Sequence, residues 1–342
     1  MRQWLTARWY SSSARPALLQ PLSWLYGGLL ALRRRAYAQG WRRTERAACP
    51  LIIVGNLTVG GTGKTPLTLW LAERLRGAGF EVGILSRGYG GREGAPQEVR
   101  PGADWREVGD EPLLLARRSG CRTVVARNRA AGARLLVRLG AQVIVCDDGL
   151  QHLRLARDCE IVVVDGARGF GNGSLLPAGP LREPVARLAH ADLLVVNGAP
   201  EHPSLAALGA DAALLRMDLI ASNALRLGAG EAPRALSAWR GAPVHAVAGI
   251  GNPARFFREL RAQGLELIEH PFPDHHGFSR SDLAFGDQLP VLMTEKDAVK
   301  CRGFADARLW YVPVVARFSD DDGRVLMARV GAKIGDPASP GS

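Results

Sequence analysis

Short apolar runs alternate along the first two thirds of the chain with segments whose apolar residues recur at helical spacing. Segments with helical spacing cover residues 66–75, 110–118 and 130–139. Strand-like apolar runs occupy residues 51–54, 81–86, 121–126, 141–147, 161–166 and 191–197. This alternation predicts a parallel sheet with right-handed crossover connections and helices on both of its faces.

The pattern changes near residue 215 and resumes near residue 241. Residues 215–240 contain no long helical segment, which indicates a linker or a short β pairing. A second α/β unit follows, with strand-like runs at 244–248, 291–294 and 310–315 and a helical segment at 253–263. We therefore expect an N-terminal segment, a core, a linker, a second α/β domain and a disordered polar tail, covering residues 1–48, 49–214, 215–240, 241–332 and 333–342.

The turn after the first strand-like run carries the strongest local signal. Residues 58–65 have the sequence Thr-Val-Gly-Gly-Thr-Gly-Lys-Thr. Glycines let backbone N–H groups converge on phosphate oxygens, and the N-terminus of the following helix adds a favourable dipole. This pattern is typical of a phosphate-binding loop, in which Lys64 reaches the β- and γ-phosphates and Thr65 holds Mg²⁺. The candidate ATP-binding residues are Thr58, Val59, Gly60, Gly61, Thr62, Gly63, Lys64 and Thr65, with Thr58 in place of the usual first glycine.

Asp147 and Asp148 end the strand-like run that begins at residue 141. A phosphate-binding-loop enzyme needs a carboxylate at such a position to hold Mg²⁺. Two adjacent aspartates repel each other unless a cation lies between them. We therefore predict Asp147, Asp148 and Thr65 as metal-associated residues and Asp148 also as a catalytic candidate. An exposed turn is the alternative for the two aspartates.

Asp110 and His275 are the candidates for acid–base chemistry. Asp110 follows Gly109 at a predicted helix start, so its carboxylate could cap that helix or accept a hydroxyl proton. His275 could form a base with an aspartate, although a lone histidine is usually structural and the neighbouring His276 leaves the register open. Arg182, in a long Gly- and Pro-rich loop, is a candidate phosphate contact.

The net charge of +11 is concentrated at the N-terminus. Residues 1–48 contain nine arginines and one acid, Glu45, which gives +8, and the rest of the chain contributes +3. The nearly balanced charge of residues 49–342 argues against nucleic-acid binding, which would require a basic face in that part of the chain. The five cysteines show no CxxC spacing, which argues against a disulfide framework or structural zinc and fits a reducing cytosol.

The N-terminal segment combines apolar, aromatic and basic residues. Residues 21–32 are apolar, three arginines follow at 33–35, and four of the eight tryptophans precede residue 42. Twelve helical residues span about 18 Å, less than the bilayer core of about 30 Å. Tryptophan and arginine favour the headgroup region of an anionic leaflet. We therefore predict a basic amphipathic anchor that lies on or dips into the membrane, with a signal peptide and a plain core helix as alternatives.

Several longer motifs occur in one order along the chain. They cover residues 21–26 before the arginines, residues 54–66, Ser86-Arg87-Gly88-Tyr89-Gly90, Gly109-Asp110-Glu111-Pro112, residues 147–152, residues 175–184 and Thr294-Glu295-Lys296-Asp297. In this order they resemble the tetraacyldisaccharide 4′-kinase family of Gram-negative bacteria over most of the chain. Thr58 at the start of the phosphate-binding loop is itself usual in that family.

The resemblance implies a P-loop NTPase-like α/β fold, a second smaller α/β domain and an N-terminal membrane-associated helix. It implies transfer of the γ-phosphate of ATP, with Mg²⁺, to the 4′-hydroxyl of tetraacyldisaccharide 1-phosphate, which gives lipid IVA in lipid A biosynthesis. It places the enzyme at the cytoplasmic face of the inner membrane, beside the leaflet that holds the lipid A disaccharide precursor. The family's aspartate–histidine pair corresponds to Asp110 and His275, and Lys64 and Asp148 complete the expected catalytic set. We expect no nucleic acid and no obligate protein partner.

One alternative function remains, a membrane-associated P-loop switch ATPase. Such switches usually carry a lysine directly before the Gly-Gly pair, and this chain has Val59 at that position. ATP turnover that depends on a lipid acceptor would separate the two functions.

Overall fold

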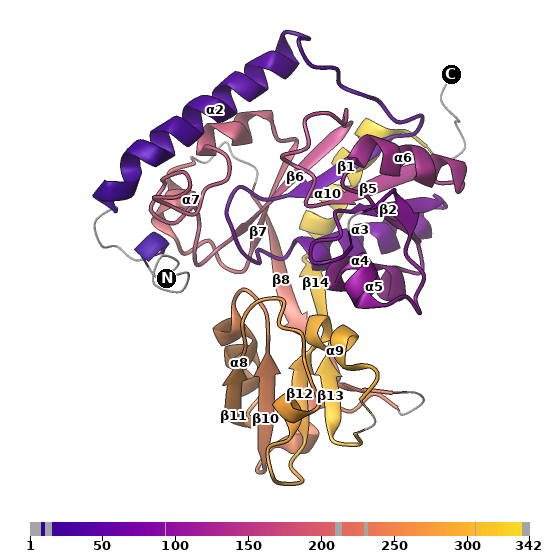
Figure 1. Ribbon diagram of the computed structural model, residues 1–342, viewed down its shortest axis with the longest axis vertical. Helices are drawn as coiled ribbons and strands as arrows, with labels where there is room; N and C mark the ends of the chain where they lie inside the picture. Colours follow the sequence, from indigo (N-terminus) through magenta and orange to yellow (C-terminus); the bar gives the residue numbers. More distant parts are fainter. Residues whose placement is uncertain are drawn as a thin grey trace.

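Two β-sheets, each with its own helices, form an upper and a lower unit in the view of Figure 1. The structure is a computed structural model and describes residues 8–10, 16–92, 94–208, 214–228, 232–304 and 306–336. We call the upper unit the first domain and the lower unit the second domain. Most of the polar tail expected at 333–342 lies outside the described residues.

Within the described residues, nine strands form the sheet of the first domain, in the order β14-β8-β7-β6-β1-β5-β2-β4-β3. The edge strands β3 and β14 pair antiparallel with their neighbours, and the others run parallel. Every residue of the three strands β1, β2 and β5 is buried, as their continuous apolar runs indicate. The strands are β1 (Leu51–Gly55), β2 (Val82–Ser86), β3 (Gln97–Glu98), β4 (Arg122–Val125), β5 (Val143–Asp147), β6 (Cys159–Asp165), β7 (Leu193–Asn197), β8 (Leu214–Ala221) and β14 (Val314–Phe318).

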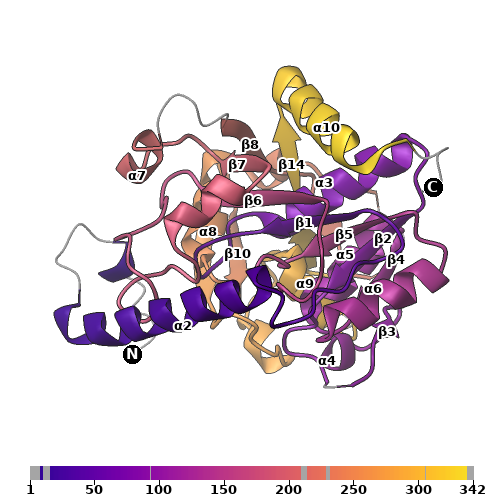
Figure 2. The ribbon, with the colours of Figure 1, turned by 90° about the horizontal axis from the view of Figure 1, so that it is seen from above.

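Helices cover both faces of this sheet, which confirms the predicted α/β architecture. Leu67 and Leu71 of α3 share one apolar core with Leu326 and Val330 of α10. Helix α6 packs against the opposite face, through a second core that includes Leu136. Figure 2 shows α3 and α10 on one side of the strands and α6 on the other. The helices are α3 (Lys64–Gly77), α4 (Trp105–Val108), α5 (Asp110–Ser119), α6 (Arg129–Arg138), η2 (Val185–His190), α7 (Pro203–Ala206) and α10 (Asp320–Ile334).

The second domain is built on a five-stranded sheet, as far as its described residues extend, in the order β11-β10-β12-β13-β9. Strand β9 is antiparallel to β13, and the other pairs are parallel. Helix α9 follows β12 directly and packs against α5 of the first domain. The elements are β9 (Leu225–Arg226), η3 (Leu236–Trp239), β10 (Pro243–Ala248), α8 (Pro253–Ala262), β11 (Glu266–Pro271), η4 (Ser281–Leu283), β12 (Val291–Thr294), α9 (Glu295–Cys301) and β13 (Leu309–Val312).

The chain crosses between the domains twice, which differs from the expected boundaries. Strand β8 lies in the segment interpreted as a linker, and β14 and α10 lie in the segment assigned to the second domain, yet all three belong to the first domain. The strand-like run at 310–315 is divided at Pro313 into β13 and β14, in different sheets. Strands β8 and β14 lie side by side between the two units in Figure 1. The sequence alone does not predict that the chain returns to the first domain, because sheet membership depends on pairing between residues far apart in the chain.

The N-terminal apolar run forms a helix on the outside of the first domain. Residues Ala17–Leu19 form η1 and residues Gln20–Ala38 form α2, the long indigo helix in Figures 1 and 2. Among the described residues, no helix is both long enough and apolar enough to cross a bilayer. The predictions that fell on residues 1–7 and 11–15, including Trp4, lie outside the described residues.

Candidate functional site

A cavity of about 500 Å³ lies where the two domains meet. The first domain lines it with the phosphate-binding loop, the turn after β2 and the side chains of Asp148 and Arg182. The second domain contributes residues 250–252, the start of α8, the loop around His275, and residues 294–296. The loops involved follow the carboxyl ends of parallel strands in both sheets, which is where open α/β sheets bind ligands.

The phosphate-binding loop connects β1 to α3, as predicted. Gly63, with φ +100°, lies at the N-terminal end of α3, and a Cβ there would approach Asn197 Nδ2 to 2.8 Å. The same Asn197 amide donates to the Thr62 carbonyl at 2.8 Å, and Arg168 Nη2 donates to the Gly61 carbonyl at 2.9 Å. The shape of the loop is therefore fixed by the side chains of Asn197 and Arg168 as well as by its glycines.

The three predicted metal-associated residues lie close together beside this loop. Thr65 Oγ1 is 3.3 Å from Asp147 Oδ2, and Thr68 donates to the other carboxylate oxygen at the same distance. Lys64 Nζ lies 3.6 Å from Asp148 Oδ1. The hydroxyl and carboxylate oxygens are hard donors of the kind that Mg²⁺ prefers. The residues present therefore fit a magnesium ion bound together with phosphate oxygens.

The two aspartates differ in their electrostatic surroundings. Burial, with a further contribution from the Glu111 carboxylate, raises the pKa of Asp147 to about 7. Burial acts the same way on Asp148, but Lys64 and Arg182 outweigh it and hold the pKa of Asp148 below its ordinary value. Arg182 donates to both Asp148 oxygens, at 2.8 and 3.1 Å, and also to Asn56 Oδ1. Arg182 is thus bound to protein carboxylate and amide groups, and because it also lines the cavity, its phosphate contact stays a prediction.

Asp110 and His275 are 165 residues apart in sequence but contact each other across the domain interface. His275 Nδ1 lies 3.0 Å from Asp110 Oδ2. The aspartate is 3% exposed, whereas the histidine is 24% exposed and lines the cavity. His276 instead places Nε2 3.2 Å from Asp282 in its own loop. The geometry thus joins His275, and not its neighbour, to Asp110.

Positively charged side chains surround the Asp110 carboxylate. Burial alone would raise its pKa, but the hydrogen bond with His275 and the charges of Lys296 and Lys300 lower the pKa of Asp110 to about 2. Lys296 Nζ lies 2.9 Å from Glu111 Oε1 and 3.4 Å from His275 Nε2. Burial disfavours the charged form of Lys296, yet the nearby carboxylates, Glu111 foremost, raise its pKa. Asp110 and Lys296 are therefore both charged at neutral pH.

Backbone conformation also distinguishes this region. Among the described residues, Asp148 and His275 are the two non-glycine residues with positive φ, at 51° and 62°. Such left-handed backbone is unfavourable for residues with a Cβ and is concentrated at functional sites. Both residues were identified as candidates from the sequence alone.

The sequence analysis did not identify several other residues of the site. Arg255, from α8, donates to Asn197 Oδ1 at 2.9 Å and lies 3.6 Å from Asp165 Oδ2, so it links the second domain to the phosphate-binding loop region. Lys296 belongs to the motif Thr294-Glu295-Lys296-Asp297, and its side chain lies beside His275. No sequence pattern predicts these contacts, because each forms only where the two domains meet.

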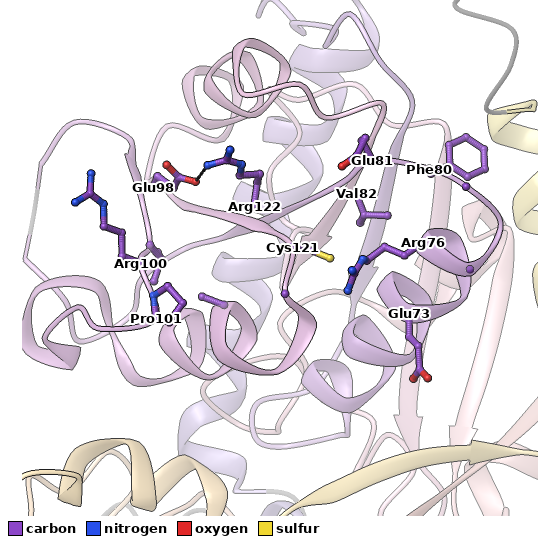
Figure 3. A pocket seen from close by; sticks show the side chains of 15 residues that line it. Glu73, Arg76, Phe80, Glu81, Val82, Glu98, Arg100, Pro101, Cys121 and Arg122 are labelled. Carbon is purple, nitrogen blue, oxygen red and sulfur yellow. Dashed lines mark hydrogen bonds and ion pairs between the residues drawn. The ribbon is translucent and has the colours of Figure 1, made fainter. Parts of the chain in front are cut away.

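A second hollow, of about 910 Å³, lies away from this site (Figure 3). It borders the first residues of β2 and β4, at the amino ends of parallel strands, so it lies at the edge opposite the phosphate-binding loop. Three arginines line it against three glutamates, and Arg122 pairs with Glu98 at 2.7 Å. Its balanced charge does not favour a phosphate ligand, and we place the candidate site in the interdomain cavity.

A family model described as "LpxK: Tetraacyldisaccharide-1-P 4'-kinase" matches residues 15–331. The chain belongs to this 4′-kinase family. Relatives within the family include the tetraacyldisaccharide 4′-kinase of Alkalilimnicola ehrlichii, which is 51% identical over 304 residues, 89% of each chain. That of Stenotrophomonas maltophilia is 50% identical over 311 residues, covering 90% of this chain and 91% of its own.

The fold agrees with a solved member of the 4′-kinase family. A crystal structure of LpxK from Aquifex aeolicus, described as an "apo" form in complex with ATP, superposes with a TM-score of 0.78. It is 29% identical to this chain and covers 93% of it and 99% of its own length. The family resemblance inferred from the motifs is thereby confirmed.

Proposed function

We propose that the protein carries out the reaction of its family, in which ATP phosphorylates the 4′-hydroxyl of the lipid A disaccharide precursor, tetraacyldisaccharide 1-phosphate. The observation that carries this proposal is that one cavity contains both a phosphate-binding loop and a candidate general base. Lys64 and Thr65 of the phosphate-binding loop line it on the first-domain side, and His275, held by Asp110, lines it on the second-domain side. A phosphoryl donor and a hydroxyl acceptor can therefore meet there.

His275 is the group that receives the hydroxyl proton in this proposal. The ionised Asp110 carboxylate only accepts hydrogen bonds, so the hydrogen of the neutral ring belongs on Nδ1. The Nε2 lone pair then faces the Lys296 ammonium group, 3.4 Å away, and the acceptor hydroxyl takes the place of this contact when it binds. As the proton moves to Nε2, the hydroxyl oxygen forms a bond to the γ-phosphorus, and the bond from that phosphorus to the β–γ bridging oxygen breaks. ADP leaves, and the ring later loses its proton to solvent.

The phosphate-binding loop positions the donor. Its backbone amides and Lys64 would contact the phosphates, and Thr65, Asp147 and Asp148 would hold Mg²⁺. When bound, the ion neutralises charge on the β- and γ-phosphate oxygens. Arg255 lines the cavity 2.9 Å from Asn197, which anchors the loop, so a positive charge from the second domain lies near the triphosphate. Apolar residues line another part of the cavity and suit the nucleotide base: Leu219, Ala221, Ile250, Phe256, Val312 and Val314.

Helix α2 attaches the enzyme to the cytoplasmic leaflet of the inner membrane in this proposal. Its inner face contacts the first domain, where Tyr26 donates to the Arg182 carbonyl at 3.0 Å. Its outer face carries four leucines with spacings of three and four residues, each more than half exposed: Leu22, Leu25, Leu29 and Leu32. Leu18 of the preceding η1 extends this exposed stripe by a further four residues. Arginines follow at 33–35. An exposed apolar stripe beside a basic cluster suits an anionic lipid surface, where the acylated acceptor resides.

Acceptor-dependent transfer of labelled phosphate tests the function. The full chain, in detergent micelles with Mg²⁺ and γ-labelled ATP, should label the tetraacyldisaccharide 1-phosphate at its 4′-position, as located by ³¹P NMR. ATP hydrolysis that is indifferent to this acceptor, with no labelled lipid, would instead support the switch ATPase.

Adjacent histidines provide a matched pair of variants for the mechanism. His275→Ala should lower kcat by roughly 10²–10⁴, the usual contribution of a general base. His276→Ala removes the contact with Asp282 and the ring contacts with Phe272 and Phe278, but none with Asp110, so its kcat should stay within about threefold of the parent. Equal losses in the two variants would contradict the assignment of His275.

A further inference from the structure

We infer that Lys300 is a positioning residue for phosphoryl transfer, which fixes the Asp110 carboxylate against His275 from the opposite domain. This inference rests on the proposed roles of Asp110 and His275. Lys300 lies in α9 of the second domain, whereas Asp110 begins α5 of the first. It lies outside the motifs identified from the sequence, and it does not line the cavity.

Two carboxylates and one aromatic ring surround the ammonium group of Lys300. Its side chain is 0% exposed, and Nζ lies 3.1 Å from Asp297 Oδ1 and 3.4 Å from Asp110 Oδ2. The ring of Phe278 lies on a further side, with its centroid 5.6 Å from Nζ, within cation–π range. A fully buried ammonium group is tolerated only where such partners are arranged around it.

Each oxygen of the Asp110 carboxylate has a fixed partner. Oδ1 accepts the Glu111 backbone N–H at 2.8 Å. Oδ2 is shared between His275 Nδ1 at 3.0 Å and Lys300 Nζ at 3.4 Å. Lys300 thus limits rotation of the Asp110 carboxylate and keeps Oδ2 directed toward the second domain, where the His275 imidazole lies.

A closed series of contacts connects Lys300 back to the histidine. Asp297 Oδ2 accepts the Gly249 N–H at 2.8 Å, and the Gly249 carbonyl accepts the His275 N–H at 3.2 Å. Asp297 uses Oδ2 for this loop contact and Oδ1 for Lys300, so Asp297 fixes the loop that holds the His275 backbone, and the lysine acts on the His275 ring through the Asp110 carboxylate. Because His275 has left-handed backbone, its loop depends on such external contacts.

The charged groups facing Asp110 come from three elements. Lys296, Asp297 and Lys300 lie on α9, His275 lies in the loop after β11, and Glu111 belongs to α5 itself. Lys296 contacts Glu111 and the outer nitrogen of the ring, so it belongs to the cavity. Lys300 is the buried member of the α9 pair, and it acts on the reaction only through Asp110.

A double-mutant cycle in the full-length enzyme tests this inference. Lys300→Met keeps the length of the side chain and removes its charge. We expect its kcat to fall about ten- to a hundredfold, because small displacements of a catalytic group cost that much, with KM for ATP within about twofold. In the Asp110→Asn background the same change should lower kcat by less than about twofold, since the group that Lys300 positions is already lost.

Arg118→Met provides the matched control. Arg118 joins the same two helices through Glu295 at 2.6 Å but does not contact Asp110, so its kcat should remain within about twofold of the parent. If Lys300→Met leaves Asp297 too unfavourably buried for folding, the comparison of Asp297→Asn with Asp297→Asn/Lys300→Met replaces it, and the second variant should lose the additional factor of ten or more.

Three outcomes would overturn the inference. They are a near-normal kcat in both Lys300 variants, an equal loss in the parent and Asp110→Asn backgrounds, and a loss in Arg118→Met as large as that in Lys300→Met. A fully active Asp110→Asn enzyme would instead remove the proposed catalytic pair. The failure of that proposal is therefore distinguishable from the failure of this one.

Discussion

Ser23 is the one buried residue of α2, and replacing it with alanine should loosen this helix from the first domain. The Ser23 hydroxyl is 2% exposed at residue level, donates to the Leu175 carbonyl at 2.8 Å and accepts the Ala178 N–H at 3.0 Å. Ser23→Ala removes both hydrogen bonds and leaves the Ala178 N–H without its partner, whereas the Leu175 carbonyl keeps the Gly179 N–H at 3.0 Å and loses one of two donors.

The expected cost follows from the burial of these groups. An unsatisfied buried amide such as that of Ala178 costs about 1–3 kcal/mol, and the more accessible Leu175 carbonyl adds about 0.5–1.5 kcal/mol. The better helix propensity of alanine returns up to about 0.7 kcal/mol. A net loss of about 2 kcal/mol in unfolding free energy remains. With an unfolding entropy of about 2.1 cal/mol/K per residue, this corresponds to a fall in Tm of roughly 3 °C for a protein of this size.

Thermal unfolding and amide hydrogen exchange would measure the effect, with Gly28→Ala as the control. A Cβ at Gly28 meets nothing within 4 Å, so this change in the same helix should raise the free energy of unfolding by about 0.5–1 kcal/mol. Ser23→Ala should also accelerate exchange of the Ala178 amide. An unchanged Tm together with unchanged exchange at Ala178 would refute the account of how α2 is held.

Three further predictions concern the reaction, the membrane and the metal. Asp110→Ala should lower kcat by roughly 10²–10⁴ with the fold retained, as measured by steady-state kinetics and circular dichroism, and near-normal turnover would exclude Asp110 from the mechanism. Deletion of residues 1–40 should release the protein from anionic vesicles without loss of ATP binding, and continued sedimentation with the vesicles would mean that other surfaces bind lipid. Asp147 has a pKa of about 7 against an ordinary 3.8, so without metal the folded state holds a proton that the unfolded state has lost, and the stability this confers should disappear as pH rises from about 4 to 7. Mg²⁺ should therefore raise Tm more at pH 8 than at pH 6, and an equal increase at both would contradict a site that includes this carboxylate.

Much of the first domain could be predicted because its signals are local. A continuous apolar run followed by Gly-Gly-Thr-Gly-Lys-Thr specifies a strand, a loop and a helix within about thirty residues, and β1 and α3 lie where that pattern places them. Asp147 and Asp148 were identifiable for the same reason, since two carboxylates at the end of a buried strand have few purely structural explanations.

The remainder of the site depends on contacts across long stretches of chain. The pairing of Asp110 with His275 was available only through the family resemblance, because 165 residues separate the two. Arg255, Lys296 and Lys300 acquire their partners when α8 and α9 meet the first domain. Strand β8 escaped recognition because Arg216 and Asp218 interrupt its apolar pattern, and its neighbour β14 arrives about a hundred residues later.

The paired strands β8 and β14 have a mechanical consequence. Because paired antiparallel strands bend and twist together, β8 and β14 allow the second domain few independent motions relative to the first. His275 and Arg255 both belong to the second domain, and both line the interdomain cavity. A shift of these two strands would therefore move both side chains together relative to the phosphate-binding loop, so a ligand that draws Arg255 toward the loop would also change the position of His275.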